Sequence, residues 1–165
     1  MASISGRGAK AHHTYTLTLT ETATSVANNN STVSYSFDLT DDNNWFWEGW
    51  NQSISYSVSA NGSVIASGYI PNHLVKSQNI AKGTITVPHN ADGTKSIAYS
   101  FSVSDGANQY YTSGNASASG TMTLSTIPRA TTPTFSAKSV TMGSAITITM
   151  KISLFCTSVS KSLLD

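Results

Sequence analysis

The chain has 165 residues, of which 39% are hydrophobic and only 10% are charged, and its formal net charge is +1. This length fits one domain, with at most part of a second. The charged fraction is far below the roughly 25% of an average soluble protein. Because Lys and Arg form no cluster, we expect no binding to nucleic acid or to an anionic membrane.

The cysteine content and the N-terminus narrow the class further. The single cysteine, Cys156, excludes an intrachain disulfide. The first residues lack the apolar stretch of a secretory signal. No apolar run approaches the ~20 residues that a membrane-spanning helix needs. Because only 10% of the residues are charged, we expect the polar surface to be made mainly of Ser, Thr and Asn.

Period-two alternation of apolar and polar residues predicts strands along most of the chain. Residues 1–11 lack this pattern and contain two glycines, so we expect a flexible lead-in there. Residues 13–21 and 31–40 alternate strongly, and the run 27–30 between them is typical of a turn.

Two further strands are predicted between residues 54 and 70. Ile54, Tyr56 and Val58 share one face, and Asn61-Gly62 is a strong hairpin signal before a shorter strand at 64–70. Residues 72–82 predict only a connection of uncertain shape.

The segment 83–103 predicts a central hairpin. Residues 84–87 and 96–103 alternate, and His89 to Thr94 is dense in turn-forming residues. A polar loop at 105–115 and a last strand, with Met122 and Leu124 inward, complete the pattern.

Seven such strands without helical periodicity predict an all-β fold. We expect an immunoglobulin-like or fibronectin-III-like antiparallel β-sandwich over residues 12–128. Residues 129–134 have the composition of a linker. Residues 135–165 begin to alternate and then lose the pattern after Met150. We interpret them as a truncated or frameshifted second β-module.

Four stretches, taken in order, carry a family resemblance: Tyr15–Glu21, Asn29–Tyr35, Gly83–Thr94 and Thr126–Thr131. Together they resemble the minor structural (tail or baseplate) proteins of siphophages and prophages of streptococci and related Gram-positive bacteria. The resemblance covers roughly residues 8–150, and the sequence departs from it after Met150.

This resemblance implies a virion protein of the phage tail that is assembled in the host cytoplasm. Its expected partners are other tail proteins or copies of itself, together with host cell-wall polysaccharide. The second interpretation is a carbohydrate-binding or adhesin module of a bacterial surface protein. The third is a polysaccharide-degrading enzyme.

The candidate glycan-binding residues are aromatic. Trp45 and Trp47 lie in a cluster of aromatic residues, and exposed rings of this kind stack on sugars. Such sandwiches also bury a tryptophan near the third strand, so packing in the core is the alternative. Tyr110 and Tyr111 are adjacent and point to opposite sides of an extended chain. One of them could contact a glycan or a neighbouring subunit, and the alternative is an ordinary surface tyrosine.

The sequence favours a protein without catalytic activity, metal or cofactor. A glycosidase needs two carboxylates that face each other across a cleft, whereas the acidic residues here mostly fall in turns or on hydroxyl-rich faces. No nucleophile elbow, phosphate loop or zinc motif is present. The four histidines share no spacing typical of a metal site.

Overall fold

The computed structural model describes residues 1–8, 13–42, 54–70, 76–105 and 114–129. The chain divides into two compact units, Met1–Ile127 and Pro128–Asp165. In the second unit only Pro128 and Arg129 are described, and both are exposed. The architecture below is therefore that of the first unit.

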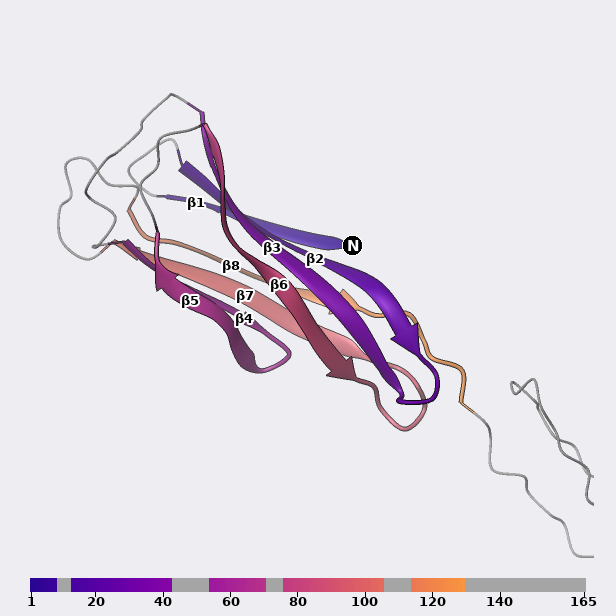
Figure 1. The fold of residues 1–165 in the computed structure, drawn as a ribbon. Helices are drawn as coiled ribbons and strands as arrows, with labels where there is room; N and C mark the ends of the chain where they lie inside the picture. The colour runs from indigo at the N-terminus through magenta and orange to yellow at the C-terminus, as the bar shows by residue number, and fades with distance from the viewer. Residues whose placement is uncertain (9–12, 43–53, 71–75, 106–113, 130–165) are drawn as a thin grey trace, which may run out of the picture. The chain divides into compact units, whose positions relative to one another are not determined.

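The described strands form two four-stranded antiparallel sheets, which confirms the all-β prediction (Figure 1). The first sheet has the order β1-β2-β3-β6 and the second has the order β5-β4-β7-β8. The strands are β1 (Ala2–Arg7), β2 (His13–Ser25), β3 (Asn30–Asp41), β4 (Ile54–Ala60), β5 (Ser63–Tyr69), β6 (Ser77–Pro88), β7 (Ser96–Asp105) and β8 (Ala116–Thr123).

The core lies between the sheets and is built from the inward residue of each alternating pair. Tyr15, Leu17 and Leu19 are fully buried on β2, while the threonines between them are only half-buried. Phe37 on β3 joins the two sheets, because its ring centroid lies 5.0 Å from that of Phe101 on β7. The mainly apolar inward faces of the two sheets provide the main stabilisation of this unit. The buried polar residues among the described strands and turns include His13, Ser31, Asp41 and His89.

The expectation of a lead-in at residues 1–11 is wrong for Ala2–Arg7, which forms edge strand β1 against β2. Its apolar signal is weak because only Ala2 and Ile4 face inward. Its outward hydroxyls pair across the strands instead, with Ser5 Oγ 2.9 Å from Thr16 Oγ1.

The prediction of a central hairpin is also wrong. Strand β6 pairs with β3 in the first sheet, and β7 pairs with β4 and β8 in the second. The turn-rich segment between them therefore crosses from one sheet to the other. Strand β6 also begins at Ser77, so part of the segment predicted as an uncertain connection is regular strand.

Each edge strand carries one glycine, and each of these glycines is paired with a tyrosine on the neighbouring inner strand. The four pairs are Gly6–Tyr15, Gly83–Tyr35, Gly68–Tyr56 and Gly120–Tyr99. At the last three, the tyrosine ring is among the atoms closest to the open side of the glycine. Because glycine has no side chain, the ring can extend toward the edge of the sheet.

A tyrosine side chain closes one seam between the sheets, and a glycine allows close approach at the other. The Tyr35 hydroxyl donates to the carbonyl oxygen of Ile65 on β5, at 3.1 Å. On the other side β1 lies against β8, where a Cβ added to Gly6 would be 2.9 Å from the carbonyl oxygen of Ser117. This contact also shows that β1 ends beside the start of β8.

Candidate functional site

The four aromatic residues predicted to bind glycan, Trp45, Trp47, Tyr110 and Tyr111, lie outside the described residues. The strands that flank them are described. Residues 43–53 follow β3 and precede β4, and residues 106–113 follow β7 and precede β8. Ile54 at the start of β4 is paired with Asp105 at the end of β7, so both aromatic segments are attached to neighbouring strand ends.

The opposite end of the first unit holds a buried polar cluster that connects Glu21, Ser31 and His89. Ser31 is fully buried, and its hydroxyl donates to Oε1 of Glu21 at 2.6 Å. Oγ of Ser31 itself lies 2.7 Å from Nε2 of His89. Nδ1 of His89 donates to the carbonyl oxygen of Gly93 at 2.8 Å, because that oxygen can only accept. The cluster therefore links β2, β3 and the crossing between the sheets.

The environment of Glu21 favours its ionised form. Burial alone would raise the pKa of Glu21, but hydrogen bonds from the Ser31 hydroxyl and from Ser125, together with the field of His89, hold this pKa below its ordinary value. The carboxylate thus acts as a double acceptor, with the Ser125 amide 2.9 Å from its Oε2.

The order of these groups is that of a structural cluster. In a hydrolytic triad the imidazole takes the proton of the serine, and the carboxylate orients the imidazole. Here the serine hydroxyl donates to the carboxylate, and the imidazole is oriented by a backbone carbonyl. With Ser31 at 0% exposure, no substrate can reach its hydroxyl in this arrangement.

The crossing between the sheets is further fixed by a hydrogen bond from the β2–β3 turn and by hydrogen bonds within the crossing itself. Asn29, at φ 50°, donates from its side chain to the carbonyl oxygen of Asn90 at 2.9 Å. The hydroxyl and amide of Thr94 both donate to Asp92, at 2.7 and 2.9 Å, and they lower the pKa of this exposed carboxyl. The turn chemistry read from the sequence is therefore present, although it joins two sheets.

The chain leaves the first unit at this same end. The amide of Leu124 donates to the carbonyl oxygen of Lys95, and the amide of Ile127 donates to that of Gly93, at 3.0 and 2.9 Å. Ile127 is 1% exposed. The exit of the first unit thus lies opposite the strand ends that carry the aromatic segments.

The outward face of the second sheet differs in chemistry from that of the first. We call the outward residues of β5, β4, β7 and β8 the serine face, and its central row is Val64–Ser59–Ser100–Ser119. Its described strand residues include no charged side chain, whereas the outward face of the first sheet carries Arg7, Asp38 and Lys82.

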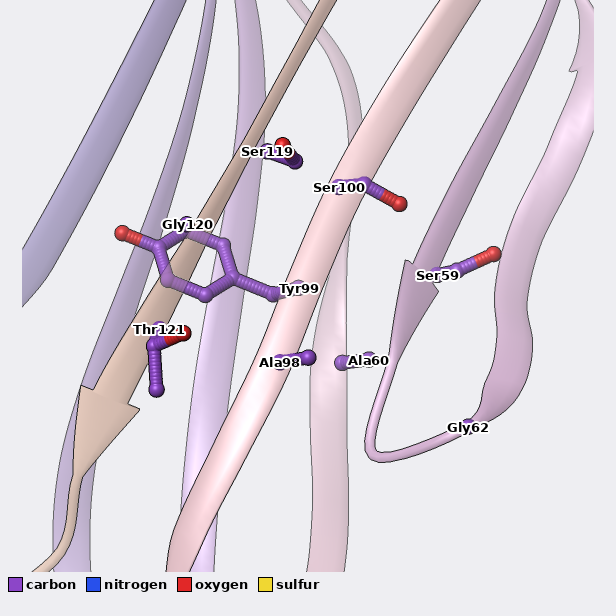
Figure 2. A pocket seen from close by; sticks show the side chains of 9 residues that line it. All are labelled: Ser59, Ala60, Gly62, Ala98, Tyr99, Ser100, Ser119, Gly120 and Thr121. Atoms are coloured by element: carbon purple, nitrogen blue, oxygen red, sulfur yellow. The ribbon is translucent and has the colours of Figure 1, made fainter.

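Two shallow hollows lie on the serine face. The larger, of about 380 Å³, is lined by Ser59, Ser100 and Ser119 together with small neighbours such as Ala98 and Gly120 (Figure 2). The smaller, of about 270 Å³, follows β7 and β8 at Ser102 and Ser117. Both hollows form because most of the side chains that line them are small.

The described part of the chain has neither a candidate metal-binding cluster nor a candidate membrane-spanning helix. Within those ranges, no group of three or more His, Cys, Asp or Glu side chains is arranged to hold a metal ion. Nor do those residues include a helix long and apolar enough to span a membrane.

The sequence prediction missed the Glu21–Ser31–His89 cluster, although a signal for part of it is present. Glu21 and Ser31 occupy inward positions of the alternating pattern, two residues from Leu19 and Val33. A polar residue at such a position needs a buried hydrogen-bond partner. The sequence spacing does not reveal that this partner is His89.

Comparison with known proteins gives one match. Residues 8–159 match the family described as "Siphovirus protein of unknown function (DUF859)". No curated protein and no solved structure matches the chain. Since the matched region spans nearly the whole sequence, the chain belongs to this family of siphovirus proteins.

Proposed function

We propose that the protein is a non-catalytic structural component of the siphophage tail, and that the first unit presents its aromatic segments to host cell-wall polysaccharide. Membership of a siphovirus family supports a phage protein over an adhesin of the bacterial surface. The tail position and the glycan contact are our inference.

The observation that carries this proposal is the polarity of the first unit. The strands flanking residues 43–53 and 106–113 end together, as the pairing of Ile54 with Asp105 requires. The exit at Ile127 is held at the other end by Gly93. A module with this polarity is attached at one end and can present Trp45, Trp47, Tyr110 and Tyr111 at the other.

Binding at such a site would depend on several copies acting together. Stacking of single aromatic rings on neutral sugars gives weak affinity, which many copies on one particle convert into stable attachment. Attachment of this kind requires neither a deep pocket nor a charged ligand.

The test is sedimentation of the purified full chain with intact streptococcal cell walls, using wild type, Trp45→Ala, Trp47→Ala and a control. Val26→Ala is the matched control, because Val26 is an apolar side chain, 53% exposed, at the exit end of the unit. We expect saturable binding that the tryptophan variants reduce at least about tenfold and the control leaves unchanged. Circular dichroism verifies that each variant is folded.

Two results would contradict the proposal. If the folded wild type does not bind walls, the glycan contact is wrong. If Val26→Ala weakens binding as much as the tryptophan variants do, the aromatic segments do not form the contact surface.

A further inference from the structure

We propose that the serine face is the surface on which a second copy of this chain docks, face to face, in a symmetric dimer. This inference does not depend on the wall contact described above. It rests on the absence of charge among the described strand residues of this face, on the shape of its surface, and on the protection of the sheet edges against pairing.

The first argument is electrostatic. Two identical faces can meet only if like charges do not oppose each other. Pairing of the first sheet with itself in this way would instead bury charged side chains of its outward face, among them Asp38 and Lys82. The serine face has no described charge on its strands, and its hydroxyls can both donate and accept. It is therefore compatible with a copy of itself.

The second argument is the relief of the face. Its raised side is β5, where Val64 and Tyr69 are 61% and 65% exposed. Both are outward, since they pair with Ser59 and Ser55. The smaller hollow lies along β7 and β8, and the larger one spans from Ser59 on β4 across β7 to Ser119 on β8. Protruding apolar side chains on β5 and hollows that reach the opposite margin at β8 are complementary after a two-fold rotation.

The register specifies which rotation fits. A two-fold axis that runs parallel to the strands, between β4 and β7, places β5 of one copy over β8 of the other. In the central row, Val64 then lies over Ser119 of the second copy, which is one of the residues that line the larger hollow. A perpendicular axis would place β5 on β5, where the raised side chains would hold the faces apart.

The sheet edges are poor alternatives for self-association. Strand β1 lies against β8, so these two edges cover each other. Strand β5 has an extra residue, Ile65, between the partners of Val58 and Ser59, and such a bulge disrupts the pairing of an edge with another strand. Strand β6 carries Lys82 and ends at Pro88, and both residue types protect an edge.

The size of the face indicates a dimer of moderate affinity. Four strands spaced ~4.8 Å apart and about seven residues long give a face of roughly 19 Å by 24 Å. Two such faces bury on the order of 1,000 Å², the lower limit for a specific interface, so we expect a dissociation constant in the micromolar range.

The first experiment measures the mass of the full chain by sedimentation velocity between about 1 and 300 µM, which spans the expected dissociation constant. The variants are Ser100→Arg at the centre of the serine face and Thr18→Arg at the centre of the other outward face. We expect Ser100→Arg to weaken the dimer at least about 100-fold, because it buries two like charges. Thr18→Arg should change it by less than about threefold.

The second experiment identifies the face by disulfide cross-linking in a Cys156→Ser background. Within one chain, Val64 and Ser119 are three strand spacings, roughly 14 Å, apart, which is too far for a disulfide. We expect Val64→Cys combined with Ser119→Cys to give a covalent dimer on oxidation. Val64→Cys alone should give none.

Each contrary result overturns the proposal. A wild type that stays monomeric throughout the concentration range excludes the dimer. A dimer that Thr18→Arg disrupts and Ser100→Arg does not must use another surface. Cross-linking by Val64→Cys alone would place β5 against β5. If the monomeric wild type binds wall polysaccharide and Ser100→Arg abolishes that binding, the face serves a glycan.

Discussion

Tyr35 lies directly across from Gly83, so close that a Cβ on that glycine would lie 2.8 Å from Oη and 2.9 Å from Cε1 of the tyrosine. The ring occupies the space that any other residue would fill. The equivalent space at Gly68 is more open, since the nearest atom of its partner Tyr56 is 3.5 Å away. Two pairs of the same type therefore tolerate a methyl group differently.

We expect Gly83→Ala to destabilise the first unit by about 1–3 kcal/mol, because Tyr35 must leave its rotamer or the strands must separate. Gly68→Ala should be neutral or stabilising by up to ~1 kcal/mol, since it fits and reduces the freedom of the unfolded chain. Urea unfolding of the two variants, followed by circular dichroism, measures both. Equal destabilisation by the two would show that ring contact is not the cause.

Tyr35→Phe keeps the ring over Gly83 and removes the hydroxyl that bonds to Ile65. We expect a loss of about 1 kcal/mol in the free energy of unfolding, the value of one neutral hydrogen bond. Tyr69→Phe is the control, because Tyr69 is exposed. Loss of its hydroxyl should change the free energy of unfolding by less than about 0.5 kcal/mol. Thermal melts of the two variants measure this difference. If Tyr35→Phe is as stable as wild type, the hydrogen bond between Tyr35 and Ile65 does not stabilise the contact between the sheets.

Asn29→Ala should destabilise the crossing between the sheets by about 1–3 kcal/mol. It removes the side-chain bond to the carbonyl oxygen of Asn90 and places alanine at a positive φ of 50°. Asn29→Gly removes the same bond but suits that φ, so it should cost less. Chemical denaturation gives the difference between them. If Asn29→Gly is as damaging as Asn29→Ala, backbone strain contributes nothing here.

Glu21 makes the stability of the first unit depend on pH. Its pKa in the folded state is below the ordinary value of 4.5, so its contribution is complete above that pH and is lost as the pH falls through the folded pKa. We expect Glu21→Gln to cost about 1 kcal/mol at neutral pH, a modest value because Glu21 is partly exposed.

The difference between wild type and Glu21→Gln should shrink as the pH falls below 4.5 and through the lowered folded-state pKa of Glu21, because the wild-type carboxyl then also becomes protonated. Melting temperatures at several pH values test this. A difference that stays constant from neutral to acid pH would mean that the charge of Glu21 is irrelevant to the cluster.

Alternation was a reliable guide to strands wherever one face is mainly apolar. Strands β2, β3 and β7 are of this kind, and the sequence predicts them at nearly their observed positions. It missed β1, because an edge strand with only Ala2 and Ile4 inward has almost no apolar periodicity. It predicted a false hairpin at 83–103, since turn residues specify how the chain bends and not whether the flanking strands pair.

The candidate sites show a similar limit. The sequence singles out aromatic residues by type, and Trp45, Trp47, Tyr110 and Tyr111 lie beyond the described strands. The Glu21–Ser31–His89 cluster and the serine face depend on residues that come together only through the register of distant strands. Such juxtapositions arise from topology, which local composition does not encode.

The hydrogen bond from the Ile127 amide to the carbonyl oxygen of Gly93 has a mechanical consequence. Pro128 has no amide proton, and Ile127 just before it donates a backbone hydrogen bond to the carbonyl oxygen of Gly93. Tension that arrives along the polypeptide from residue 128 onward therefore acts on the bond to Gly93. That carbonyl lies in the segment that joins both sheets, so the load is divided between two layers from the start. A module loaded at this point would resist the separation of one edge strand from its sheet.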